Sequence, residues 1–417
     1  MSDELGFLIF EKPAKVADNT LPNMVALLTG LKIIERQHAK MDNTSSDFAL
    51  NFAAEASKDL GTFVWDRFKA KGCVTMLNSD PVRKGYGFGF YPKDTIHGFR
   101  KPPTHYYFRP FYHYFNLYPY QSRTTRAPGC YGDLRADETV FKLLNRWFQV
   151  YSDTCHFSVT MALHDYTHDN PSGIGNLDSK LMRFLQELKS GNLLENTVFI
   201  MIGDHGHRFG PLKSTDIGQI EERMAFFSVY FPEWFREKYR EVWQVLKLNT
   251  QRLVTHWDLH KTLEAILYAE FSASQVRWFG RGRSLFQPIP EARTCADTDV
   301  PVQFCLCLIP QPINKSINHQ MRLYLSAVLK TNLLINEVIE YSPNEYVQLG
   351  VRHFDLETQL KLLKPRKSAR ITFFWTSGYL TQKNTGFAAQ VLFDRKTKRL
   401  QLVCFSGSTN SSNLFRA

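Results

Sequence analysis

Five apolar residues, Val198 to Ile202, run directly into a segment crowded with ionisable side chains. A continuous apolar run of this length is typical of a strand that is buried in a sheet. Asp204 and His205 follow the run after a single glycine. Charged groups at the end of a buried strand need a cation, a proton network or a ligand to offset the cost of burial. A structural aspartate and an exposed loop are the alternative, and this stretch alone does not decide between them.

The sequence around this run predicts an α/β fold. Residues 155–163 alternate apolar and polar side chains, and residues 177–188 place their leucines and a phenylalanine on one helical face. The order strand, helix, strand indicates a central, mostly parallel sheet flanked by helices. From about residue 291 the segments become short and β-rich. We therefore expect an α/β domain over residues 1–290 and a smaller β-rich C-terminal domain over residues 291–417.

The strand predicted over residues 155–163 also ends in a cluster of possible ligands. His164, Asp165, His168 and Asp169 follow it closely. The carboxyl ends of parallel strands meet at one edge of a sheet, where ligands bind in folds of this class. Imidazole together with oxygen ligands suits zinc or manganese, whereas the histidines disfavour calcium and magnesium. Two such strand ends together predict a metal centre.

Thr20 lies just before an apolar helix that Pro22 opens. A hydroxyl at this position is commonly an ordinary helix cap, and Asn19 or Thr20 suits that task. The amino end of a helix is also where an activated nucleophile would meet an anionic substrate. Taken alone, the segment favours the cap.

Charge and cysteine content limit the partners and the compartment. The excess of 51 Lys and Arg over 40 Asp and Glu suits anionic partners, but no basic block or nucleic-acid-binding motif occurs, so we expect no nucleic acid. No apolar run approaches the roughly 20 residues that span a membrane, and no export leader opens the chain as given. Cys295, Cys305 and Cys307 cluster. Disulfides or buried thiols fit this spacing better than half a zinc site.

Nine segments, in order, resemble the alkaline phosphatase and sulfatase superfamily. They are more closely similar to an uncharacterised animal branch of it, a large extracellular family of unknown function with a sulfatase-like core. The segments are NTLPNMVALLTG (19–30), VWDRFKAKGCVTMLNSD (64–80), GFRKPPTHYYFRPF (98–111), DYTHD (165–169), GDHGHRFG (203–210), GQIEERM (218–224), THWDLHKTL (255–263), GRGRSLF (280–286) and CADTDVPVQFCLC (295–307). The resemblance implies the sulfatase-like form of the α/β fold and a protein of the secretory pathway or the extracellular space.

The resemblance also implies roles for particular residues. Thr20 matches the hydroxyl that is both metal ligand and nucleophile, and that forms a covalent phospho- or sulfo-enzyme. Asp204 and His205 match ligands of the same metal. Asp165 and His168 match a pair that holds a second metal or binds the leaving group. The implied cofactor is a divalent metal, namely zinc, manganese or calcium.

Other residues have two interpretations each. Arg208 offers a planar fork for sulfate or phosphate oxygens, and equally fits a salt bridge at the strand end. His105 and Arg109 resemble family residues that line the substrate pocket, although the aromatic residues around them also fit ordinary packing. We expect the run Glu221, Glu222 and Arg223 to be a buried ion-pair anchor and not a catalytic dyad. We expect His260 to be a structural residue on a helix face.

The superfamily pattern further includes a metal-binding aspartate at the end of an initial strand, tens of residues before the nucleophile. Only 19 residues precede Thr20, so we expect this strand and its ligand to be absent. The expected function is a metal-dependent hydrolase or transferase that acts on sulfate or phosphate esters. The alternative is a catalytically inactive, sulfatase-like pseudoenzyme that serves as a binding or scaffold protein.

Overall fold

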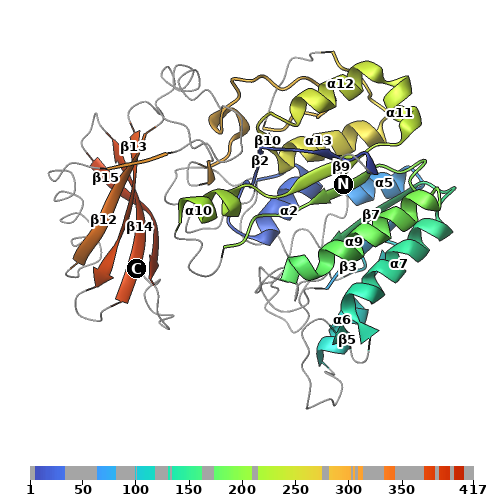
Figure 1. Ribbon diagram of the computed structural model, residues 1–417, viewed down its shortest axis with the longest axis horizontal. Coiled ribbons are helices and arrows are strands. Elements are labelled where there is room, and N and C mark those ends of the chain that lie inside the picture. Colours follow the sequence, from blue (N-terminus) through green and yellow to red (C-terminus); the bar gives the residue numbers. More distant parts are fainter. Residues whose placement is uncertain are drawn as a thin grey trace. The chain divides into compact units, whose positions relative to one another are not determined.

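A computed structural model of the chain shows two compact units (Figure 1). The structure describes residues 5–32, 63–80, 99, 101–117, 130–131, 134–161, 173–208, 215–274, 281–301, 304–305, 309–312, 333–342, 371–380, 385–394 and 399–407. The described residues up to Glu291, together with Thr298–Val300, form the first unit, and those of Ala292–Asp297 and from Pro301 onward form the second.

A parallel sheet forms one part of the first unit. Strand β3 (Val74–Ser79) lies between β4 (Tyr106–Tyr107) and β7 (His156–Met161), and both neighbours run parallel to it. The β7 strand lies within the segment for which alternation predicted a strand. Helices α7 (Ala136–Val150) and α9 (Gly173–Ser190) pack against each other beside it (Figure 1). The expectation of an α/β fold with parallel strands flanked by helices is therefore confirmed.

The two faces of β3 contribute to different hydrophobic clusters because successive side chains of a strand point to opposite sides. Leu77 belongs to the cluster that includes residues of α2 (Thr20–Thr29), α5 (Val64–Ala70) and α13 (His256–Leu267). Met76 belongs to the cluster that includes Trp147 of α7 and Leu185 of α9. Leu185 is fully buried, as the apolar face predicted for this helix requires.

The apolar run after residue 197 forms a strand, but its pairing corrects the predicted sheet. Strand β8 (Phe199–Ile202) pairs antiparallel with β9 (Phe227–Tyr230), which in turn pairs antiparallel with β1 (Leu8–Ile9). Two further strands, β2 (Pro13–Ala14) and β10 (Val254–Thr255), pair in parallel with each other. The expected single, mostly parallel sheet is thus replaced, among the described strands, by separate parallel and antiparallel ladders. The four residues of β8 are half-buried. An apolar run indicates a strand but does not determine the direction of the neighbouring strand.

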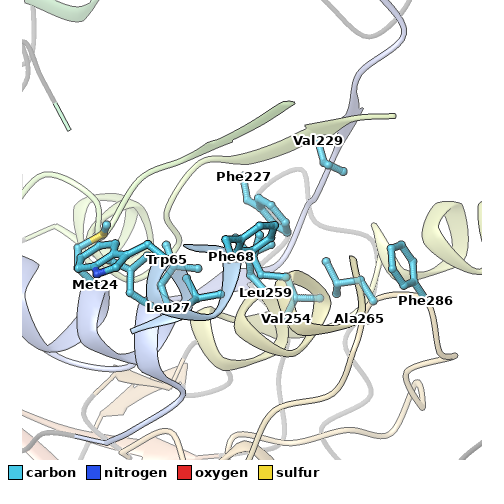
Figure 2. Packing of buried hydrophobic residues seen from close by; sticks show 14 of the residues in the cluster. Met24, Leu27, Trp65, Phe68, Phe227, Val229, Val254, Leu259, Ala265 and Phe286 are labelled. Atoms are coloured by element: carbon cyan, nitrogen blue, oxygen red, sulfur yellow. The ribbon is translucent and has the colours of Figure 1, made fainter. Parts of the chain in front are cut away.

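Three helices pack around the main core (Figure 2). They are α2 (Thr20–Thr29), α5 (Val64–Ala70) and α13 (His256–Leu267), and the cluster joins Met24 and Leu27 of α2 to Trp65, Phe68, Phe227 and Leu259. Helix α2 ends at Gly30, whose positive φ of 72° suits glycine. A side chain at that glycine would also meet the ring of His260.

His260 is structural, as expected. Its Nδ1 atom lies 3.0 Å from the carbonyl oxygen of Leu27, so the ring ties α13 to the last turns of α2. Helix α13 itself begins with a capping box formed by Thr255 and Asp258. These contacts fix the position of α2, the helix that Thr20 begins.

The remaining helices differ in one respect from expectation. The sequence of residues 232–247 predicts one helix, but the structure divides it at Tyr239 into α11 (Glu233–Lys238) and α12 (Arg240–Asn249). Tyr239 has a ψ of 55°, which is outside the helical range. The other described elements of the first unit are α6 (Arg109–Leu117), α10 (Asp216–Arg223), β5 (Cys130–Tyr131) and β6 (Leu134–Arg135).

In the second unit, five strands pair antiparallel in the order in which they occur along the chain. They are β11 (Ile309–Pro312), β12 (Leu333–Ser342), β13 (Ile371–Leu380), β14 (Thr385–Asp394) and β15 (Arg399–Gly407). A short 3₁₀ helix, Ala296–Thr298, precedes them.

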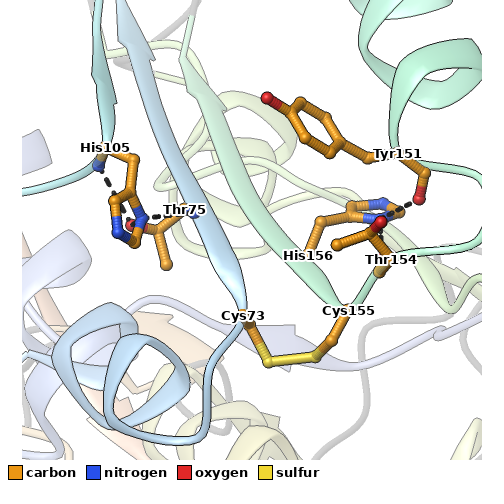
Figure 3. Close-up of a disulfide and its surroundings, with 7 residues drawn as sticks. All are labelled: Cys73, Thr75, His105, Tyr151, Thr154, Cys155 and His156. Atoms are coloured by element: carbon orange, nitrogen blue, oxygen red, sulfur yellow. Dashed lines mark hydrogen bonds between the residues drawn. A yellow bond between two sulfur atoms is a disulfide. The ribbon is translucent and has the colours of Figure 1, made fainter.

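Two disulfides are present among the described residues. Cys73 and Cys155 join β3 to β7 at the start of both strands (Figure 3). Cys295 and Cys305 close a short loop. This confirms the expectation of disulfides over a zinc site for the latter pair, while Cys307 lies outside the described residues.

Candidate functional site

The loop after β8 is held to the start of β9 and to α10 by its backbone. The amide of Gly203 donates to the carbonyl of Phe226 at 2.7 Å, and the amide of Gly206 donates to that of Glu222 at 3.0 Å. A Cβ atom on Gly206 would lie 1.7 Å from the carbonyl oxygen of Glu221. Glycine is therefore required at this position because two backbones approach closely.

Asp204 and His205 lie side by side in this loop. The Nδ1 atom of His205 lies 2.8 Å from the carbonyl oxygen of Gly206. A carbonyl can only accept, so Nδ1 carries the proton and the lone pair of a neutral ring is on Nε2. That Nε2 atom is buried and has no hydrogen-bond partner, and it lies 3.4 Å from Oδ2 of Asp204.

Burial keeps the His205 ring neutral. Desolvation lowers the pKa of His205, although the carboxylate of Asp204 opposes the shift. A neutral imidazole that donates through one nitrogen to a backbone carbonyl presents its other nitrogen as a metal ligand or a proton acceptor. That His205 holds a metal stays a prediction.

Thr20 is the first residue of α2, and Asn19 is the capping residue. The turn before the helix is shaped by Asn23, a residue that the sequence did not single out. Its side-chain oxygen accepts from the amides of Val16 and Ala17, each at 2.9 Å, and its amide donates to the carbonyls of Ala17 and Asn19 at 3.0 Å. Fully buried, Asn23 fixes the turn that carries Thr20.

Ion pairs join this turn to the loop after β8. Nη1 of Arg208 lies 3.1 Å from Oδ2 of Asp18, although 190 residues separate the two in the sequence. Oδ1 of Asp18 lies 3.7 Å from Nζ of Lys15, and this Nζ lies 2.8 Å from Oε1 of Glu222. The structure thus brings Arg208 into the neighbourhood of Thr20 by way of Asp18.

Lys15 is a central member of this network and was not predicted. Its side chain has no exposed area, and burial lowers its pKa, against the opposing effects of Glu222 and Asp18. The contact with Lys15 confirms the expectation that Glu222 belongs to a buried ion-pair anchor. The two carboxylates favour the charged form of Lys15, whereas burial favours the neutral form.

His256 is a third residue that the sequence did not single out, after Asn23 and Lys15. It follows β10, whose partner β2 leads directly into Lys15. The ring is fully buried, and neither of its nitrogens has a hydrogen bond of good geometry. Burial lowers its pKa to about 4, while the nearby carboxylate of Asp204 and the carbonyls of Gly203 and Ala14 act in the opposite direction. A histidine directly after a short apolar strand was the available signal, because Asp204 and His205 follow a strand in a similar way.

Asp204 and His205 fit a divalent cation as neighbouring carboxylate and imidazole ligands. Across the described part of the chain, no three His, Cys, Asp or Glu side chains are grouped to hold an ion. Thr20 supplies a hydroxyl, which is a different kind of ligand. Asp165 and His168, the other predicted ligands, lie outside the described residues.

The two predicted substrate-binding residues lie beside β3. The Nδ1 atom of His105 accepts a hydrogen bond from the amide of Thr75 at 3.1 Å, and the Thr75 hydroxyl accepts from the amide of His105 at 3.2 Å (Figure 3). Thr75 is near the start of β3, next to the Cys73 disulfide. Arg109 begins α6, where burial lowers the pKa of its guanidinium and Tyr107 opposes the shift.

The described residues define a mixed α/β protein in which polar groups from three strand ends converge. Lys15 follows β2, Asp204 and His205 follow β8, and His256 follows β10. The comparison with protein families identifies the chain further. Residues 1–343 match the family described as "Protein of unknown function (DUF229)", and the chain belongs to this family. No curated protein matches the sequence.

Two observations bear on the cellular setting. Disulfides are typical of proteins that are secreted or face an oxidising compartment. The Cys73–Cys155 and Cys295–Cys305 disulfides therefore suggest a secreted or extracellular protein. Among the described residues, no helix has the length and apolar character needed to cross a membrane.

Proposed function

We propose that this protein is a metal-dependent hydrolase or transferase that acts on sulfate or phosphate esters through Thr20. The observation that carries the proposal is the Arg208–Asp18 ion pair of 3.1 Å. It links the loop that bears Asp204 and His205 to the turn that bears Thr20. The sulfatase-like pattern of the sequence supports the same assignment.

In the proposed reaction, Thr20, Arg208 and the amino end of α2 each have a role. The Thr20 hydroxyl attacks the sulfur or phosphorus atom, a new Thr20 Oγ1 ester bond forms, and the bond to the leaving alcohol breaks. Water then hydrolyses this ester and regenerates the hydroxyl. The guanidinium of Arg208 binds non-bridging oxygens of the transferred group, where its planar fork matches their geometry. The amino end of α2 adds backbone N–H groups directed at an anion.

Asp204 and His205 are the described residues that would hold a metal, together with the Thr20 hydroxyl. Asp165 and His168 complete the set by resemblance. A bound zinc, manganese or calcium ion would lower the pKa of the threonine hydroxyl and offset the charge that develops on the transferred group. In the same proposal, the protein works in the secretory pathway or outside the cell.

The test is turnover of 4-nitrophenyl sulfate and 4-nitrophenyl phosphate by the purified full chain, with zinc, manganese or calcium added separately. We expect one ester to be cleaved and Thr20→Ala to reduce kcat by at least about 1,000-fold, because a nucleophile and its ester intermediate are lost together. Thr154→Ala is a matched control. Thr154 is an exposed threonine that precedes β7, whereas the predicted ligands Asp165 and His168 follow this strand.

Elemental analysis separates the two functions that the sequence leaves open. Metal bound by the wild type and lost in Asp204→Ala, together with ester turnover, supports the hydrolase. Stoichiometric metal with no turnover of either ester would count against the hydrolase and in favour of the pseudoenzyme, a binding or scaffold protein.

A further inference from the structure

In the candidate site, the carboxylate of Asp18 contacts Arg208, the arginine that is predicted to bind an anion. Its Oδ2 atom is 3.1 Å from Nη1 of Arg208. A carboxylate and a tetrahedral oxyanion offer a guanidinium the same kind of contact, namely negatively charged oxygens in one plane. A substrate that binds Arg208 therefore competes with Asp18.

The second ion pair of Asp18 is not needed to neutralise its partner. Lys15 lies 3.7 Å from Asp18, but the carboxylate of Glu222 is closer, at 2.8 Å, and both Lys15 and Glu222 are buried. The Lys15–Glu222 pair is thus neutral by itself. Movement of Asp18 away from the site would leave Arg208, Lys15 and Glu222 with a net charge of +1.

Asp18 is also the most solvent-accessible member of the group. Its side chain is 37% exposed, compared with 18% for Arg208, 9% for Glu222 and 0% for Lys15. An ion pair that is partly exposed contributes little to stability, so a carboxylate in this position can exchange its partner for water at small cost. The turn itself stays in place because Asn23 holds the backbone of residues 16, 17 and 19.

From these contacts we infer that Asp18 is a specificity-determining residue. Its carboxylate, which belongs to the protein itself, occupies the position on Arg208 where an oxyanion would bind. A ligand must therefore displace Asp18 from Arg208. A ligand with a single carboxylate gains only the contact that Asp18 loses, and it still has to offset the entropy of association. A tetrahedral oxyanion has further oxygens, which would be available to the amino end of α2, two residues beyond Asp18. Asp18 therefore selects sulfate or phosphate groups over simple carboxylates.

This inference rests on the proposed role of Arg208, and binding measurements test it without any requirement for turnover. Inorganic sulfate, inorganic phosphate and acetate are titrated into the full chain by calorimetry at constant ionic strength. We expect Asp18→Asn to bind sulfate or phosphate about tenfold more tightly than the wild type, and to bind acetate measurably as well. Asp153→Asn removes an exposed carboxylate elsewhere and serves as the matched control, with affinities equal to those of the wild type.

A second variant and a double variant keep the outcome decisive. Asp18→Ser should show the same tighter binding, and the gain should vanish in Asp18→Asn combined with Arg208→Gln. Unchanged or weaker oxyanion binding in folded Asp18→Asn would overturn the inference. So would the loss of the folded state in both single variants, because the inference gives Asp18 no structural role.

The two proposals can fail separately. Tighter, Arg208-dependent oxyanion binding without ester cleavage would leave the role of Asp18 intact and remove the hydrolase. Ester cleavage by the wild type, with equal sulfate and phosphate affinities in Asp18→Asn, would leave the hydrolase intact and remove the role of Asp18.

Discussion

Acidification from pH 7 to pH 5 should destabilise the fold through His256. In the unfolded chain an imidazole takes up a proton near pH 6.5, whereas burial lowers the pKa of His256 in the folded protein to about 4. Between these values the unfolded state binds more protons than the folded state, so the free energy of unfolding falls as the pH falls. The contribution is fully present above about pH 6.5 and is lost progressively down to about pH 4.

The size of the effect follows from the two pKa values. The full difference corresponds to about 3 kcal/mol, of which about 2 kcal/mol is lost between pH 7 and pH 5. The assay is urea unfolding of chelator-treated protein at both pH values, followed by far-UV circular dichroism. Chelation is needed because a bound cation near Asp204 would change the protonation of the ring.

His256→Gln supplies the comparison because glutamine keeps a polar side chain that does not titrate. We expect the free energy of unfolding of the wild type to fall by about 2 kcal/mol more than that of the variant over this pH range. Other groups that titrate, including His205, contribute to both proteins and largely cancel. Equal decreases in the two proteins would refute the reasoning, since they would show that His256 is not kept neutral by burial.

Two further changes should lower stability by different means. Asn23→Ala leaves the buried amides of Val16 and Ala17 without their acceptor. It should therefore reduce the free energy of unfolding, measured by urea titration, by about 2–4 kcal/mol. A loss below about 0.5 kcal/mol would contradict the role given to this side chain. Replacement of Cys73 and Cys155 by serine opens a loop with a sequence separation of 82, and should lower the free energy of unfolding by about 4 kcal/mol. A midpoint of thermal unfolding equal to that of the wild type would argue against this disulfide.

The elements that periodicity identified are present where the sequence placed them. Residues 177–188 lie in α9, and the apolar run ending at Ile202 lies in β8. Burial of one face is a property of the local sequence, because a helix or strand must repeat its apolar residues with its own period. The position of Asp204 and His205, directly after an apolar strand that is half-buried, follows from the same local pattern.

The sequence predicted a mostly parallel sheet, and this prediction was wrong for the pairing of β8. The neighbour that it found is β9, which runs antiparallel and returns from α10. An apolar run satisfies either direction, since parallel and antiparallel ladders bury the same side chains. The division between α11 and α12 was missed for a related reason, because the apolar pattern continues across Tyr239 although its backbone leaves the helix.

The sequence by itself determined which segments are buried and which residue types stand at their ends. Only the tertiary structure decided that Lys15 meets Glu222, 207 positions away, and that Arg208 meets Asp18 across 190 positions. It also brought His256 to the side of Asp204. Periodicity describes how one segment relates to the core, whereas contacts at such separations depend on how whole elements pack, and no local pattern carries that information.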